Sequence, residues 1–398
     1  NNRTIFLDRQ LLKAGIVDDK ERVKAIKAIK SAEERQRIFQ KLKRIKEKQN
    51  PGLSSLSVPF WPEDETGHKA PCFSANKLPR NQQQELTYET FHDPEIITTF
   101  LMQRNREHYH QAEGTPFAAN PLLEYFGRSG VTRHTLSFFA GNSWPHGPLA
   151  EAVSAILTTL RQRQLPMIDA TFSIDDIRNG YKAWKERTST SPNGVHLGHQ
   201  KTLILSPPSD EKDMDDVGTS YFRAVAKQLT VASLTGRPLT RWIDIATTVI
   251  PKALGDDRIE KQRMLQIPAS DANLFFGILW GRRLLYHATD HNALNEDQWG
   301  TRPGRSATDV LLLKHLTYNM LHLSQTGCGT FDNDAKSCYD RIVIALANLR
   351  SYQLGLPLNT CSLLENFLSQ AHYRLRTGLG LSNTYYSTED GCYLHGPG

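Results

Sequence analysis

A hairpin pattern set among helical segments constrains the fold of this chain more than any other feature of its sequence. Residues 239–268 place β-branched runs on both sides of the turn-like Leu-Gly-Asp-Asp at 254–257, and that pattern predicts a β-hairpin. The other strongly periodic segments have the apolar spacing of helices: 94–112, 145–164, 173–184, 217–233 and 269–285. The sequence therefore predicts an α+β protein whose N-terminal region is mostly helical.

The length of 398 residues exceeds what one hydrophobic core usually organises and predicts two or three domains. A composition of 39% hydrophobic and 23% charged residues excludes a disordered or fibrous chain. No apolar run reaches the length of about 18 residues that a membrane span needs, and the N-terminus lacks a secretory pattern. We expect no membrane partner and a cytoplasmic or nuclear location. Because the sequence begins with Asn and stops at Tyr-Leu-His-Gly-Pro-Gly, we expect a fragment at both ends.

The charge and the cysteines bear on possible partners. The five cysteines are scattered without a Cys-x-x-Cys pair, which excludes a disulfide framework and a zinc knuckle. The net charge is +6, and residues 20–50 alone hold twelve Lys or Arg against four Glu. Apolar residues in 18–50 recur on one helical face, so one or two basic amphipathic helices are predicted. Three interpretations of this basic arm are open. It could lie along the phosphate backbone of a nucleic acid, it could bind a partner helix, or its charges could form an ordinary solvated helical face.

Three charged groups of the second half of the chain invite a chemical interpretation. Lys252 and Arg263 lie on either side of the hairpin turn, where they would contact triphosphate or backbone phosphate. The alternative is an ordinary surface hairpin. If 327–334 is a strand, Asp332 and Asp334 share one face, and two carboxylates so close favour a metal site. Asp340 would open the next helix and interact with its positive end.

The segment Asp-Ala-Lys-Ser-Cys-Tyr-Asp at 334–340 resembles the first catalytic motif of retrotransposon-type reverse transcriptases. Four further segments resemble motifs of that family in the same order: SPNG, the pair VIPK and QRMLQIP, QWGTRPGRSATD, and YRLRT with GCYLHGPG. The match covers roughly residues 170–398. It implies a mostly helical N-terminal region followed by incomplete right-hand polymerase fingers and palm. The implied regions are a basic helical arm at 1–50, a linker and helices of unknown function at 51–169, and fingers with a partial palm at 170–398.

The resemblance also implies roles for individual residues. Asp334 and the backbone carbonyl of Ala335 would hold Mg²⁺ or Mn²⁺, with two ions about 4 Å apart clamping the reacting oxygens. Tyr339 falls where the family excludes the 2′-hydroxyl of the incoming nucleotide; its alternative is a core aromatic. Lys252 and Arg263 would bind the triphosphate of the dNTP.

Three more residues would lie near the RNA template or the DNA primer: Gln298, Arg302 and Arg305. Thr301 replaces the family's usual Phe between them, and Asp332 has no counterpart. The family's second carboxylate motif would lie beyond Gly398, so the resemblance implies that this fragment does not polymerise by itself. Two alternatives remain open: a non-catalytic nucleic-acid-binding remnant of a retroelement, and an RNA-directed RNA polymerase.

Overall fold

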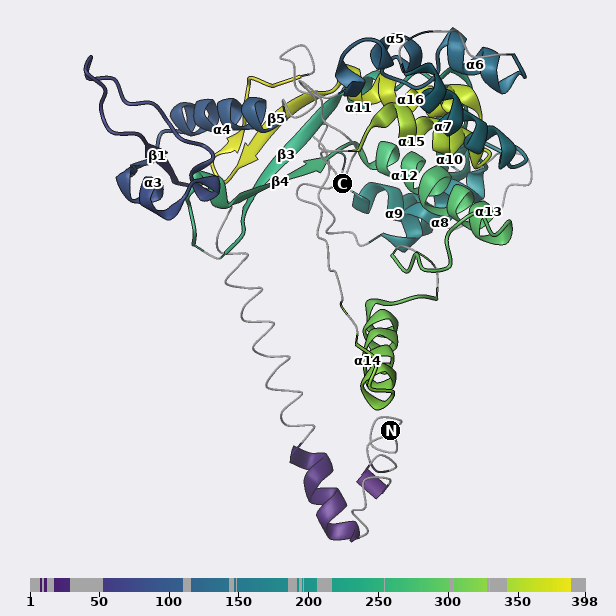
Figure 1. Ribbon diagram of the computed structural model, residues 1–398, viewed down its shortest axis with the longest axis horizontal. Helices are drawn as coiled ribbons and strands as arrows, with labels where there is room; N and C mark the ends of the chain where they lie inside the picture. The colour runs from purple at the N-terminus through teal and green to yellow at the C-terminus, as the bar shows by residue number, and fades with distance from the viewer. Residues whose placement is uncertain are drawn as a thin grey trace. The chain divides into compact units, whose positions relative to one another are not determined.

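The computed structural model shows an α+β chain in which helices predominate, as the sequence predicts (Figure 1). It describes residues 8, 11–12, 18–28, 53–109, 116–142, 147, 149–184, 192, 195, 197–205, 217–253, 255–300, 302, 304–327, 329 and 342–387. The backbone forms two compact units. The first unit contains 1–92, 249–263 and 377–380, and the second contains 93–248, 264–376 and 381–398. The division at residue 170 that the resemblance implies concerns function and stays a prediction.

The first unit contains a two-stranded sheet. Strand β1 (Leu56–Phe60) pairs antiparallel with β2 (Thr87–Phe91), and all five residues of β1 are buried. Within the region 51–169, where the sequence analysis expects a linker and helices, residues 56–60 thus form a buried strand. Pro59 lacks an N–H and reads as a breaker, but its carbonyl still accepts a bond of 2.7 Å from the amide of Cys72. Two short helices complete this part, η1 (Ala75–Lys77) and α3 (Arg80–Glu85).

Residues 19–28 form a helix, as predicted for the basic N-terminal segment. Within it Val23 is 53% exposed, whereas Ile26 is buried. Arg22 donates to Asp8 at 2.9 Å and also pairs with Asp19. The rest of the expected arm, residues 29–50, lies outside the described ranges.

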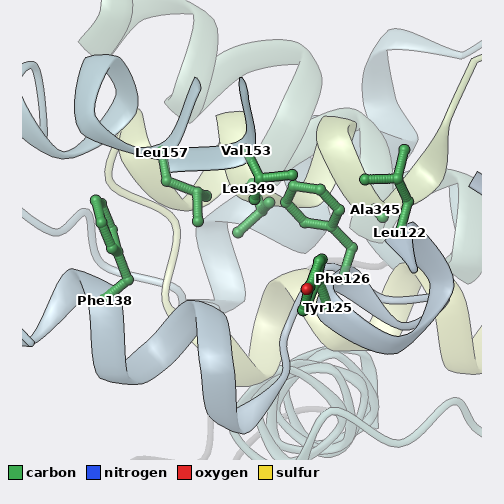
Figure 2. Close-up of a cluster of buried hydrophobic side chains, with 8 residues drawn as sticks. All are labelled: Leu122, Tyr125, Phe126, Phe138, Val153, Leu157, Ala345 and Leu349. Atoms are coloured by element: carbon green, nitrogen blue, oxygen red, sulfur yellow. The ribbon is translucent and has the colours of Figure 1, made fainter. Parts of the chain in front are cut away.

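The second unit begins with α4 (Pro94–Tyr109), whose Tyr109 stacks on Tyr386. The helices that follow are η3 (Pro116–Ala118), α5 (Leu122–Phe126), α6 (Arg133–Phe139) and α7 (Ala150–Gln162). Figure 2 shows the shared core, which α5, α6 and α7 form with α15 (Ile344–Gln353); its buried members are Leu122, Tyr125, Phe126, Phe138, Val153, Leu157, Ala345 and Leu349. The predicted helices at 94–112 and 145–164 are thus confirmed, with α7 starting later than its sequence pattern.

A second helical core surrounds α10 (Val217–Thr235) and α16 (Leu358–Gln370). The helix predicted over 173–184 is present as α8 (Ile174–Ala183), and a capping box begins it, in which Ser173 accepts from the amide of Asp176. The remaining elements of this core are α9 (Leu197–Leu205), α11 (Thr240–Ile243), α12 (Ser270–Ile278), the π-helical η5 (Leu279–Leu284) and α13 (Leu285–Asp290). Trp242 is fully buried here, 5.3 Å from the ring of Phe275.

The second sheet has the strand order β4-β3-β5-β6. Its strands are β3 (Asp244–Pro251), β4 (Gln262–Ile267), β5 (His372–Thr377) and β6 (Gly380–Leu381). β3 and β4 form the predicted hairpin, joined through η4 (Ile259–Lys261). β3 also pairs in parallel with β5, from Asp244 opposite His372 to Thr248 opposite Arg376. Figure 1 shows β5 beside β3 in the sheet.

Two helices flank the aspartate segment in the sequence. α14 (Ala307–Leu323) begins with a capping box between Ser306 and Asp309, and none of its residues is buried. α15 begins at Ile344, because Val343 has an extended backbone. Asp332 and Asp340 lie outside the described residues, so the role predicted for Asp340 at a helix start stays a prediction. None of the helices in the described ranges combines the length and apolar character that a membrane crossing requires.

Candidate functional site

The two cations predicted for the β3–β4 hairpin, Lys252 and Arg263, are both exposed at one end of it. The amide of Lys252 donates to the carbonyl of Lys261 at 2.9 Å, which fixes the pairing at the end of the hairpin. Antiparallel pairing then sets Ile250 opposite Arg263, and both are exposed, whereas the neighbouring Gln262 is buried. Lys252 directly follows the last residue of β3 and is exposed as well. Lys252 and Arg263 are thus two exposed cations at the same end of the hairpin.

Lys261 is a third cation at this end of the hairpin, and the sequence analysis missed it. It lies beside Lys252 through the backbone bond and precedes Arg263 by two residues. Lys261 ends η4, and the signal in the sequence was a further basic residue two positions before Arg263. Together these three residues form the hairpin cation group. A group of this kind attracts phosphate oxygens, with the guanidinium able to bind two oxygens at once.

Hydrogen bonds from β1 hold the segment that joins β3 to β4. The carboxylate of Asp257 accepts from the hydroxyls of Ser55 at 2.8 Å and Ser57 at 2.9 Å. The amide of Ser57 also donates to the carbonyl of Asp257 at 3.0 Å. Gly255 has φ +80, a conformation that favours glycine in the turn. The hairpin cation group is therefore carried by a segment with a defined backbone.

A buried acid of η4, Glu260, links the same segment to β2. Glu260 is buried, and its Oε1 accepts a 3.0 Å bond from the hydroxyl of Tyr88. Burial, and next the negative charge of Glu260, raise the pKa of Tyr88 to about 12. The tyrosine therefore remains a neutral donor at physiological pH. Arg258 forms an ion pair of 2.7 Å with Asp256, which raises the pKa of its guanidinium further.

The loop that precedes α14 brings Gln298, Arg302 and Arg305 close together. The amide of Gln298 and the Nη1 of Arg302 both donate to the carbonyl of Asn295, each at 3.0 Å. Arg305 donates to the carbonyl of Gln298 at 3.4 Å and lies 4.8 Å above the ring of Trp299. Both arginines therefore use donors to order their own loop. Their predicted contact with template or primer stays a prediction.

The predicted metal ligands Asp334 and Ala335 lie outside the described residues, and so does Tyr339. Within the ranges that the structure does describe, no group of three or more His, Cys, Asp or Glu side chains is arranged to hold a metal ion.

A second polar surface, also missed by the sequence analysis, lies on β5 in the other unit. His372 and Arg374 share one strand face with Arg376, and Tyr385 lies over the first two. Asp244 of β3 accepts from Arg374 Nε at 3.1 Å. The alternation of basic and apolar residues in His-Tyr-Arg-Leu-Arg-Thr was the available signal for this face.

A comparison with models of known protein families finds no match, and a search of curated proteins finds no similar sequence.

Proposed function

We propose that this chain is the N-terminal portion of an RNA-directed DNA polymerase of a retroelement, with residues 170–398 forming its fingers and part of its palm. The observation that carries the proposal is the hairpin cation group, in which Lys252 and Arg263 are exposed at the same end of the hairpin. The hairpin precedes the Asp334 segment in the chain, in the order that the reverse-transcriptase resemblance requires. The proposed substrates are an RNA template, a DNA primer and a dNTP.

The work of the described residues in this function would be electrostatic. A dNTP carries its negative charge on phosphate oxygens, and Lys252, Lys261 and Arg263 supply three positive charges at one end of a hairpin. Positioning and charge neutralisation account for most of phosphoryl-transfer catalysis, so no nucleophilic side chain is needed. Asp334 and Ala335 would hold Mg²⁺ or Mn²⁺, which when bound stabilises charge on the attacking and leaving oxygens.

The first test is primer extension by a protein continued through the downstream gene. Asp334→Asn should lower the extension rate by at least about 100-fold, because it removes the proposed metal-binding carboxylate. Asp175→Asn, at an exposed position in the first turn of α8, is the matched control and should leave the rate unchanged. Equal rates for Asp334→Asn and the unmodified protein would contradict the metal assignment.

A second test addresses the hairpin cation group. Lys252→Met and Arg263→Gln should each raise the KM for dNTP by about 10-fold, the value of one charged hydrogen bond. The exposed Arg237→Gln serves as a control for the loss of one positive charge elsewhere. A rise in KM of the same size in that control would show that general charge, and not this hairpin, matters.

The alternatives predict other results. A non-catalytic nucleic-acid-binding remnant, favoured by the basic excess in 20–50, would bind nucleic acid without extending a primer in any form of the gene. An RNA-directed RNA polymerase would incorporate ribonucleotides already with Tyr339 present. A DNA-making enzyme should accept them only after Tyr339→Ala.

A further inference from the structure

Alternating orientation along residues 382–387 sets two neighbouring tyrosines on opposite sides of the sheet. Tyr373 of β5 and Tyr386 exchange two backbone hydrogen bonds, of 2.9 and 3.2 Å. Tyr386 is fully buried and stacks on Tyr373 at 5.2 Å and on Tyr109 at 6.0 Å. The preceding residue, Tyr385, therefore points to the other side, where it is 39% exposed.

The ring of Tyr385 lies on side chains of β5. Its centroid is 4.1 Å from that of His372, with an interplanar angle of 24°, and the guanidinium carbon of Arg374 is 5.4 Å from it. A phenol ring has two faces, and the imidazole stacked at this distance covers one of them. Tyr385 nevertheless remains 39% exposed, so part of the ring is left in contact with solvent beside these two side chains.

Polar contacts fix Arg374 and His372, the two side chains against which the Tyr385 ring lies. Arg374 Nε donates to Asp244 Oδ1 at 3.1 Å, and its Nη1 donates to the carbonyl of Asn383 at 2.7 Å. The second contact ties the guanidinium to the segment that carries Tyr385 itself. His372 Nδ1 is also 3.9 Å from Asp244 Oδ1. A ring supported in this way loses little conformational freedom when a ligand stacks on it.

The charge of this face is complementary to phosphate. His372, Arg374 and Arg376 occupy alternate positions of β5 and so face the same side. Asp244 lies on that side as well and is paired with Arg374. The face is therefore lined by basic side chains at alternate positions of β5, which attract phosphate oxygens.

We propose that an unpaired nucleobase of single-stranded RNA or DNA stacks on the exposed part of the Tyr385 ring, with the adjoining phosphate attracted by Arg374 and Arg376. An exposed aromatic ring beside cations is the arrangement with which proteins bind single strands with little regard to sequence. This inference deepens the proposed function, since it names a place where an unpaired template or primer base is held. Its evidence is independent of the metal site.

The test measures binding of the full chain to fluorescent oligonucleotides without any polymerase reaction. Probes are oligo-uridylate and oligo-thymidylate of equal length, an abasic oligonucleotide with the same phosphates, and a phosphopeptide of equal charge. Tyr385→Leu should weaken binding of both base-bearing probes by about 5- to 100-fold, the range for loss of one aromatic stack. Tyr385→Phe should bind like the unmodified protein, because it keeps the ring.

Tyr286→Leu is the matched control, since Tyr286 is an exposed tyrosine of α13 in the same unit. It should leave oligonucleotide affinity unchanged, and equal melting temperatures of all variants would show that folding is intact. Abasic or phosphopeptide binding as tight as base-bearing binding would overturn the proposal, as would equal affinities of Tyr385→Leu and the unmodified protein. This binding assay involves no primer extension, so loss of the Tyr385 effect overturns only the base-stacking proposal, whereas absence of extension by the longer protein overturns the polymerase proposal.

Discussion

On one face of β5 the side chains of Tyr373 and Leu375 are almost fully buried, whereas on the other face His372 and Arg374 remain in contact with solvent. The same backbone serves both faces, because successive strand residues point in opposite directions. The adjacent tyrosines 385 and 386 repeat the contrast with one residue type. A one-residue step along this sheet therefore separates side chains that stabilise the fold from side chains that a ligand can contact.

The two tyrosines, Tyr385 and Tyr386, should differ most in how much each contributes to the free energy of unfolding. Tyr386→Ala should lower the free energy of unfolding by about 3–5 kcal/mol, because it opens a cavity between two stacked rings. Tyr385→Ala should cost less than about 1 kcal/mol, as expected for a partly exposed side chain. Urea denaturation followed by circular dichroism measures both values. Losses of equal size would remove the distinction between the two faces.

A second prediction compares a partly buried carboxyl group, that of Glu365, with the exposed carboxyl group of Asp175. Glu365 lies on α16, where burial raises its pKa to about 7, against the opposing effect of Arg128. A carboxyl group whose folded pKa is raised contributes most stability below its unfolded pKa of about 4.3 and loses it as the pH rises through 7. Glu365→Gln removes that loss. The variant should therefore be more stable than the unmodified protein by about 2 kcal/mol at pH 8, after discounting for partial solvent contact.

Thermal or urea unfolding between pH 4 and pH 8 measures this difference. The two proteins should converge at pH 4, where Glu365 is protonated in the folded state. Asp175→Asn controls for loss of an exposed carboxylate and should show no such pH dependence. A constant difference between Glu365→Gln and the unmodified protein over the whole range would contradict the raised pKa.

Local sequence patterns predicted the hairpin and the helix α8, because both depend on residues close together in the chain. They did not foretell the pairing of β3 with β5, which brings Asp244 to Arg374 across 130 positions. Without that pairing the basic side of β5 could not be recognised as one surface. The sequence analysis missed β1 because a proline such as Pro59 is typical of loops. Pairing with β2 and burial nevertheless make residues 56–60 a strand. The predicted metal site depends on Asp334, outside the described ranges.

A third prediction uses adjacent threonines of β3 to test the same alternation. Thr247 is buried, and its Oγ1 donates to Gln266 Oε1 at 2.7 Å and lies 3.3 Å from the hydroxyl of Tyr386. Thr247→Val should cost about 1 kcal/mol, because it leaves the Gln266 oxygen without this donor. Thr248 Oγ1 is buried with no hydrogen-bond partner among the described residues, so Thr248→Val should be neutral or slightly stabilising. Chemical denaturation of both variants measures the contrast, and equal costs would contradict it.

The smallest expected change in stability, and the one that joins stability to binding, concerns Asp244. Its ion pair with Arg374 is partly exposed on both sides, so Asp244→Asn should change the free energy of unfolding by less than about 1 kcal/mol. The same change removes the carboxylate that opposes the cations of β5. Oligo-uridylate should therefore bind about two- to threefold more tightly at low salt, and less so as salt screens the charges. Asp175→Asn removes the same charge from α8 and should leave affinity unchanged. Weaker binding by Asp244→Asn would mean that the carboxylate is needed to hold Arg374 beneath Tyr385, and that support outweighs charge on this face.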